Sequence, residues 1–293
     1  MDILSSVFGV IIENSKAYKE LENEKLNLEK KVEERTKEVY TRNKIIERDL
    51  MATKVFHQNL MPSSIPEIKG IKGDILYQSL EEIGGDFYDF IKISDTKLLF
   101  IIADSAGHGI RASLLTAMVK TSLYTYPDKT YSDLKDLTIH INDSMYGKVM
   151  DKYVVAVIGI IDIEKNIIDL IGGGNIVIFY FSKKEKNWQR ISLNGHMLGI
   201  IPTEVLKLAT TTVEFRKGDI IFLATDGIPE YYKRDPVTGD RIVFGEEGIL
   251  KQLKKYVNSP YLISKAILKS MSSFCEDCKN SDDLTAITIW KEE

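Results

Sequence analysis

What this sequence lacks argues against a disulfide scaffold, a secretion signal and nucleic-acid binding. Two cysteines among 293 residues are too few for a disulfide framework, and they favour a reducing, cytoplasmic setting. The apolar N-terminal segment, residues 1–12, has no basic flank and no cleavage site, and it is too short to span a bilayer. Charges of the two signs nearly balance, at a formal net charge of −4, so no basic surface for nucleic acid or an anionic membrane is expected.

Proline is also scarce, with seven in the chain and none from Glu13 to Leu60. Within that stretch, residues 20–48 consist largely of charged residues that are good helix formers. Pro62 and Pro66 then interrupt the helical pattern. The sequence therefore predicts an N-terminal helix over residues 1–60 and a globular domain over residues 61–293.

Apolar residues recur along this helix at intervals of seven. Leu21 and Leu28 are one heptad apart, and a second seven-residue register contains Val32, Val39, Ile46 and, after Thr53, Leu60. Arg35, Arg42 and Asp49 interrupt the pattern, which favours a weak or switchable coiled-coil homodimer over a static rod. The alternative is a solvated helix without a partner. Residues 8–21 also resemble the closing helix of a GAF-type sensor domain, so the helix is a candidate remnant of such a sensor.

A carboxylate ends the most apolar stretch of the chain. Residues 98–103 form an unbroken apolar run typical of a strand buried on both faces, and Asp104 follows directly. Two glycines come next, and helical spacing of apolar residues begins at Ile110. Because charged groups are rarely buried unless they are paired or bind a metal, Asp104 is a candidate functional residue.

Three further acids stand at the ends of predicted strands. Asp86 follows two glycines, Asp226 ends the apolar run 220–225, and Asp282 precedes the last apolar run. If the four acids converge they repel one another, and oxygen-rich clusters of this kind hold Mg or Mn rather than zinc. The alternative is four unrelated turn residues, since Asp before Gly is ordinary turn chemistry.

The motifs around these acids resemble those of a known family. GGDFYDF contains Asp86, DSAGHG begins at Asp104, TDG contains Asp226, and DDLT begins at Asp282. In this order they are similar to the PPM (type 2C-like) serine/threonine phosphatases, in the bacterial branch typified by the SpoIIE and RsbU regulators of sigma-factor partner switching. The similarity extends from about Asn59 to the C-terminus.

The resemblance implies a fold, a cofactor and a role for each acid. The implied fold is α+β, with two antiparallel sheets packed face to face and flanked by helices. Asp104 would bridge two divalent cations, Mn or Mg, and Ser105 would add a backbone carbonyl ligand. Asp226 and Asp282 would hold one cation and Asp86 the other. An activated water, and no side chain, would then attack phosphorus.

Elements predicted from the apolar pattern agree with an α+β layering, because strands come in runs and helices in pairs. Strands are expected at residues 75–80, 87–93, 98–103, 154–163, 166–171, 176–182, 207–215, 219–225 and 284–290. Helices are expected at residues 110–126, 131–150, 246–257 and 260–276.

Residues near the four acids are expected to have supporting roles or none in the site. Asp89 and Asp283 are expected to support the neighbouring ligands from a second layer. Arg111 could clamp a substrate phosphate or face solvent at the start of a helix. His108 is interpreted as a turn residue, since carboxylates suffice for Mg or Mn.

Two other short motifs have a resemblance to known functional motifs but differ from them. Residues 172–175, Gly-Gly-Gly-Asn, replace the Ala-Gly-His segment that follows the hairpin in much of this branch, and the missing histidine puts fine positioning in doubt. Cys275 and Cys278 form a CxxC that cannot complete a zinc site alone, and it is interpreted as a coincidental pair.

The sequence thus predicts a metal-dependent hydrolase of phosphoserine or phosphothreonine, with a STAS-type anti-sigma-factor antagonist as the substrate that the resemblance suggests. A catalytically inactive pseudophosphatase is one alternative, although all four motif acids are present. The other is a dimeric signalling scaffold whose N-terminal helix is the functional part. The preferred cation and the upstream signal are left open.

Overall fold

The computed structural model describes residues 2–80, 83–107, 109–149, 152–275, 278 and 282–292, without the side chains of residues 2–6 and 10. The chain divides into two compact units, Met1–Ala52 and Thr53–Glu293. Helix α1 (Asp2–Leu60) supplies the whole of the first unit, and its last two turns belong to the second. No helix in the described ranges is both long and apolar enough to cross a membrane.

Within the first unit the heptad residues of α1 are exposed. Leu21, Leu28, Val32, Val39 and Ile46 each keep more than half of their surface accessible in the single chain. Ion pairs such as Arg42 with Glu38, one turn apart, lie along the same helix. The residues that would form the seam of the predicted homodimer thus lie at the surface of the single chain.

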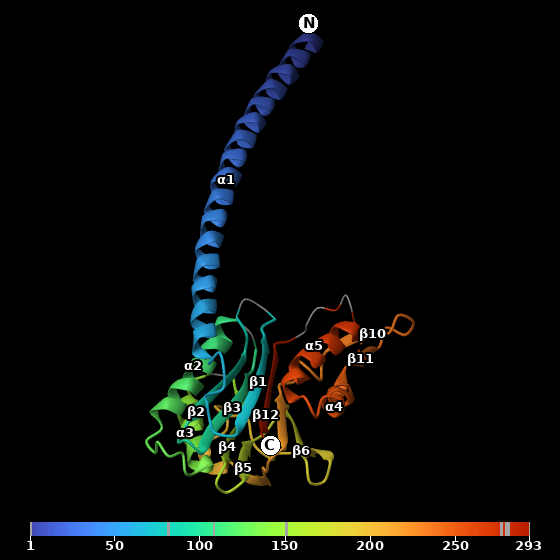
Figure 1. The fold of residues 1–293 in the computed structure, drawn as a ribbon. Coiled ribbons are helices and arrows are strands. Elements are labelled where there is room, and N and C mark those ends of the chain that lie inside the picture. Colours follow the sequence, from blue (N-terminus) through green and yellow to red (C-terminus); the bar gives the residue numbers. More distant parts are fainter. Residues whose placement is uncertain are drawn as a thin grey trace. The chain divides into compact units, whose positions relative to one another are not determined.

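The second unit contains two five-stranded sheets, and every paired strand in them is antiparallel (Figure 1). In spatial order, the first sheet consists of β1 (Ile71–Gln78), β12 (Leu284–Lys291), β9 (Ile220–Ala224), β6 (Val177–Ser182) and β7 (Asn187–Ile191). The second sheet consists of β2 (Asp86–Lys92), β3 (Lys97–Ser105), β4 (Val154–Asp162), β5 (Ile167–Gly172) and β8 (Thr211–Glu214). A separate hairpin joins β10 (Tyr232–Arg234) to β11 (Arg241–Val243).

Helices cover the outer face of each sheet. The second sheet packs against α2 (Ile110–Thr125) and α3 (Leu134–Met145), and the first against α4 (Gly245–Lys255) and α5 (Ile263–Phe274) (Figure 1). Two short 3₁₀ turns, Thr203–Val205 and Pro260–Leu262, lie in connections. This arrangement confirms the predicted α+β class.

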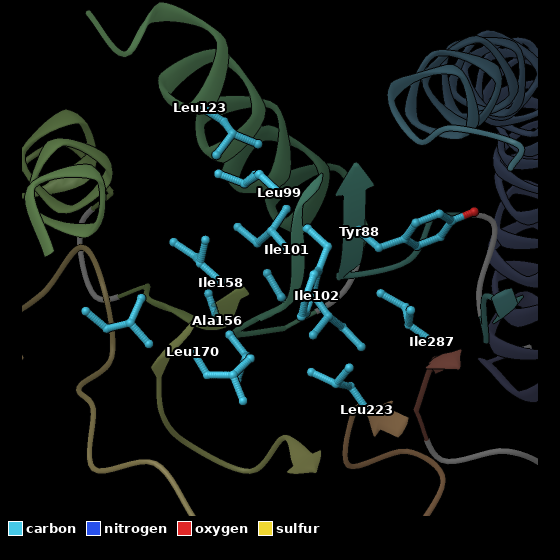
Figure 2. Packing of buried hydrophobic residues seen from close by; sticks show 14 of the residues in the cluster. Tyr88, Leu99, Ile101, Ile102, Leu123, Ala156, Ile158, Leu170, Leu223 and Ile287 are labelled. Carbon is cyan, nitrogen blue, oxygen red and sulfur yellow. The ribbon is translucent and has the colours of Figure 1, made fainter. Parts of the chain in front are cut away.

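The core lies on both faces of β3, as its unbroken apolar run predicts (Figure 2). Leu99 and Ile101 lie towards Leu123 of α2, whereas Ile102 lies towards Leu223 and Ile287 of the first sheet. Successive side chains of a strand point to opposite faces. Asp104, two residues after Ile102, therefore points towards the first sheet.

Three strands, β7, β10 and β11, were not predicted from the sequence. Strand β7 has only Trp188 buried among polar neighbours, so it carries no apolar pattern. The β10–β11 hairpin consists of exposed or half-buried residues that hold together by backbone pairing.

The expectation that Cys275 and Cys278 are a coincidental pair is wrong. The structure joins them in a disulfide just beyond the end of α5. Their Cα atoms lie 5.5 Å apart, a separation that suits a disulfide. The two residues between them lie outside the described part of the chain.

Candidate active site

The first two acids face each other across the second sheet. Asp86 at the start of β2 is the register partner of Asp104 near the end of β3. Neighbouring strands lie about 5 Å apart, so the two carboxylates are brought together on one face. That face is the one that meets the first sheet.

Hydroxyl groups from the first sheet hold Asp86 in place. Its Oδ2 accepts hydrogen bonds from Thr225 Oγ1 at 2.7 Å and from Thr285 Oγ1 at 2.5 Å. Asp86 is 2% exposed, so both bonds lie in the interior. The carboxylate therefore has one oxygen fixed by the opposite sheet and Oδ1 left for another partner.

The other predicted ligands border a single cavity of about 260 Å³. Asp104 and Ser105 enter it from β3, Asp226 from the residues after β9, and Asp282 from those before β12. The remaining lining residues are Leu80, Ala106, Gly107, Tyr153, Val155, Gly174, Asn175, Met197 and Asp283. The structure thus gathers Asp104, Ser105, Asp226 and Asp282 at one place, with Asp86 paired to Asp104 behind them.

Burial and mutual repulsion dominate the electrostatics of Asp86, Asp104 and Asp226. Burial, followed by the charges of Asp226, Asp282 and Asp283, raises the pKa of Asp104 to about 8. Burial and then the charge of Asp104 raise the pKa of Asp86 well above its usual range. Burial also raises the pKa of Asp226, against a hydrogen bond from Asn175. Each acid would be ionised far more readily beside a cation.

Asp283 supports the site through the backbone. Its Oδ2 accepts the amide N–H of Gly85 at 2.5 Å and that of Asp86 at 3.2 Å, while Oδ1 accepts Leu80 N–H at 2.7 Å. These bonds fix the chain that leads into β2. The predicted supporting role of Asp283 therefore has a structural basis, through main-chain bonds on which Asp86 depends.

Glycine is required where this chain passes β3. A Cβ atom on Gly85 would lie 2.6 Å from the carbonyl oxygen of Gly107 and 3.1 Å from that of Ser105. Ser105 in turn donates its hydroxyl to the carbonyl of Gly85 at 2.8 Å. Any larger residue at position 85 would therefore crowd the Ser105 carbonyl, which is the predicted backbone ligand.

Asp89 does not support Asp86 directly. Three residues along the strand, it points to the opposite face, where its carboxylate pairs with Lys120 of α2 at 2.9 Å. Arg111 is exposed on the first turn of α2 and does not line the cavity. His108 lies outside the described residues.

Sequence reasoning missed three side chains of the site. Thr225 and Thr285 were inside the quoted motifs, and their hydroxyls could have been read as partners for a buried carboxylate. Asn175 ends the glycine run that lacks the expected histidine, and its side-chain amide donates to Asp226 Oδ2 at 3.3 Å. Nothing in the local sequence signals that contact, because 51 residues separate the two.

The donor set suits hard divalent cations. The described residues that line the cavity include the acids Asp104, Asp226, Asp282 and Asp283 and no lysine, arginine or histidine. Asp283 already accepts hydrogen bonds from backbone amides, which leaves three acids as candidate ligands. Carboxylate and carbonyl oxygens are the ligands that Mg and Mn prefer. In the described part of the chain, no three Asp, Glu, His or Cys side chains are close enough together to enclose an ion as they stand.

Solved structures of PP2C phosphatase domains share this fold. The SiaA-PP2C domain of Pseudomonas aeruginosa matches 85% of this chain and 98% of its own, at 17% identity and a TM-score of 0.71. The phosphatase domain of SpoIIE from Bacillus subtilis, with a fragment of its regulatory domain, matches 76% of this chain and 62% of its own, at 17% identity and a TM-score of 0.63. RsbX in complex with magnesium matches 78% and 98%, at 22% identity and a TM-score of 0.57. The fold is therefore that of a PPM-type phosphatase domain.

The model of the family described as Stage II sporulation protein E (SpoIIE) matches residues 94–290, and the chain belongs to that family. A curated relative, Protein IcfG of Synechocystis sp., is 20% identical over 261 residues. The match covers 80% of this chain and 40% of that relative, so the chain spans less than half of IcfG.

Proposed function

We propose that this protein is a Mn- or Mg-dependent phosphatase that hydrolyses phosphoserine or phosphothreonine in another protein. The observation that carries the proposal is the convergence of Asp104, Asp226 and Asp282 on one cavity, with Asp86 paired to Asp104. Four acids from four separate segments meet where the two sheets meet. Membership of the SpoIIE family supports the same reaction.

Asp104, Asp226, Asp282 and the Ser105 carbonyl would hold the cations on the cavity side, and Asp86 would contribute its free Oδ1. When bound, such ions lower the pKa of a coordinated water and neutralise the charge that develops on the phosphoryl group. The chain's own residues supply the frame. Thr225 and Thr285 fix the orientation of Asp86, and Asn175 orients Asp226.

A lysine stands at the edge of the cavity. A methyl group placed on Gly107 would lie 3.5 Å from Lys152 Nζ, so this ammonium is next to the cavity lining. A lysine binds phosphate as a compact point charge. We assign Lys152 to the incoming phosphoryl oxygens, a role that the exposed Arg111 does not fill.

The site suits a side chain that is presented by another protein. Asp282 is exposed and Asp104 and Asp226 are half-buried, so the acids are reached directly from the surface. The family resemblance favours a STAS-type anti-sigma-factor antagonist as that protein, in a cytoplasmic signalling pathway. The exposed heptad stripe of α1 supports a homodimer through this helix, which would control the phosphatase.

The decisive experiment measures release of phosphate from a phosphoserine-containing STAS protein, with Mn, with Mg and with a chelator. We expect turnover that requires the metal and is lost in Asp104→Asn. Asp169→Asn is the matched control, since Asp169 lies on β5 and binds Thr212 away from the cavity. Metal-independent turnover would refute the mechanism, and metal binding without turnover on any phosphoprotein would identify a pseudophosphatase.

A further inference from the structure

A second cavity, of about 970 Å³, lies at the other end of the first sheet. It is formed by the end of β6, the start of β7, the start of β9, the end of β12 and the segment that joins α4 to α5. Its lining residues are Phe181, Lys183, Lys186, Trp188, Gly218, Ile220, Lys254, Val257, Asn258, Pro260, Tyr261, Trp290, Lys291 and Glu292. None of them lines the acidic cavity.

The strand register separates the two cavities. Leu284 of β12 follows the acids Asp282 and Asp283, whereas Trp290 of the same strand lines the second cavity. Six residues at about 3.3 Å each place roughly 20 Å between these points. A ligand in the second cavity therefore binds independently of the proposed metal ligands.

Aromatic rings dominate one part of the lining. Trp188 is 8% exposed and packs against Phe181 with 5.4 Å between ring centroids. Trp290 is half-buried and Tyr261 is 61% exposed, so both present ring surface that the fold does not cover. The indole N–H of Trp188 is buried without an acceptor among the described residues. Within the described residues, the cavity thus contains uncovered ring surface and one indole N–H that lacks a hydrogen-bond acceptor.

Positive charge dominates the rim. Lys186 and Lys254 are exposed and line the cavity, and Glu292 is the one acid among its described lining residues. Lys291 is buried, with its ammonium donating to Asn166 Oδ1 at 2.8 Å, and it does not belong to this rim. Two exposed lysines beside an aromatic surface are complementary to a ligand that has both a flat ring and negative charge.

We propose that this cavity is a non-catalytic binding site for a nucleotide, with the base against Trp290 and Tyr261 and the phosphates against the lysines. Any nucleobase can stack on an aromatic side chain, because every base has a π face. Lysine ammonium groups bind phosphate oxygens. The volume falls in the range of pockets for small ligands. The proposal goes beyond the phosphatase reaction and does not depend on it.

Tryptophan fluorescence tests the proposal directly, because Trp188 and Trp290 are the only tryptophans of the chain and both line the cavity. The full-length protein is titrated with ATP and GTP in a chelator, which keeps nucleotide–metal complexes out of the acidic site. We expect a saturable change in emission with nucleotides. Adenosine, which lacks phosphate, and tripolyphosphate, which lacks a base, should bind at least about tenfold more weakly.

Matched variants locate the site. Lys254→Gln should weaken nucleotide binding by about tenfold, whereas Lys255→Gln should leave it unchanged, because Lys255 stacks over Tyr256 and does not line the cavity. Tyr261→Ala should also weaken binding. Because the Tyr261 side chain is 61% exposed, this substitution should leave the protein folded. Absence of a saturable change at millimolar nucleotide would overturn the proposal. So would equal binding of tripolyphosphate and ATP, or equal losses in the two lysine variants.

Discussion

Asp89 and Lys120 form an ion pair in which Asp89 Oδ2 lies 2.9 Å from Lys120 Nζ, and the carboxylate is almost fully buried. The same ammonium donates to the main-chain carbonyl of Leu60, the last residue of α1. One lysine of α2 therefore ties the end of α1 to β2, three residues after Asp86. This contact lies wholly within residues 53–293 and connects the end of the helix to the strand that carries a predicted ligand.

Removing the lysine should be costly. Lys120→Met leaves Asp89 buried without its cation, and we expect a loss of about 3–5 kcal/mol in the free energy of unfolding, measured with urea at neutral pH. The double variant Lys120→Met with Asp89→Asn should recover most of the loss, because no unpaired charge remains. If the double variant were as unstable as the single one, the penalty would have a cause other than the buried charge.

Asp104→Asn should nearly abolish metal-dependent turnover while the metal-free protein stays folded. The substitution removes one of the mutually repelling carboxylates, so the melting temperature without metal should be equal or higher. Asp226→Asn should behave alike. Calorimetry in chelator, beside the phosphatase rate in Mn, checks both parts. Full activity in either variant, still dependent on metal, would show that the ligand assignment is wrong.

Substitution of the adjacent acids Asp282 and Asp283 should affect different properties of the protein. Asp282 is exposed and lines the cavity, so Asp282→Asn should cut turnover and metal affinity with little change in stability. Asp283 binds three backbone amides, so Asp283→Asn should lower the free energy of unfolding by about 1–3 kcal/mol.

At saturating metal and a temperature where both variants are folded, Asp282→Asn should show the larger loss of activity. Isothermal titration with Mn and urea unfolding give the two readouts. Equal losses of stability in the two variants would mean that the division between a ligand and a backbone support is wrong.

The stability of the metal-free protein should fall as pH rises. Asp104 has a folded pKa of about 8, raised by burial and neighbouring acids, against about 4 when unfolded. Between these values the folded state binds more protons than the unfolded state, so the free energy of unfolding decreases from about pH 5 to pH 8. Urea unfolding in chelator measures the slope. Asp104→Asn should flatten it, and an unchanged slope would place the proton uptake elsewhere.

The N-terminal helix should respond to repair of its heptad pattern. Replacing Arg35 and Arg42 with leucine should tighten a homodimer, since both stand at positions that favour apolar residues in a coiled coil. We expect the phosphatase rate to shift to one extreme, in a direction that the structure does not dictate. Solution mass and rate are compared for the natural chain, the double leucine variant and a chain that begins at Thr53. If all three chains had the same solution mass and the same phosphatase rate, the helix would neither form a dimer nor control the phosphatase.

The fold was largely predictable where burial leaves a pattern. The apolar runs of β3, β4 and β9 have both faces covered, and the helical spacing after Ile110 predicted α2 to within one residue at its end. Strand β7 was not predictable, because an edge strand with one buried side chain has no period to detect. The division between the two compact units leaves no mark in the sequence, since the same helical pattern continues across residue 52.

The sequence was enough to single out four acids as candidate ligands, but not to identify the side chains that bind them. Asp104 and Asp226 directly follow an apolar run, and Asp86 and Asp282 stand just before a predicted strand, which is why these four acids could be selected. That Thr225 and Thr285 bind Asp86, or that Asn175 binds Asp226, depends on the packing of distant segments, which local pattern does not encode. Asp89 was misjudged because strand alternation turns it away from Asp86.

The bonds from Asp283 to residues 80, 85 and 86 have a consequence for the timing of synthesis. About 200 residues of chain separate the carboxylate from the amides that it holds. Strand β12 also stands between β1 and β9, so β1 has no neighbour in its sheet until β12 arrives. Long-range pairings of this kind form late. A nascent chain on the ribosome therefore cannot fix the segment that leads into β2 until Asp283 has been made, and it cannot complete its first sheet until translation has passed Lys291.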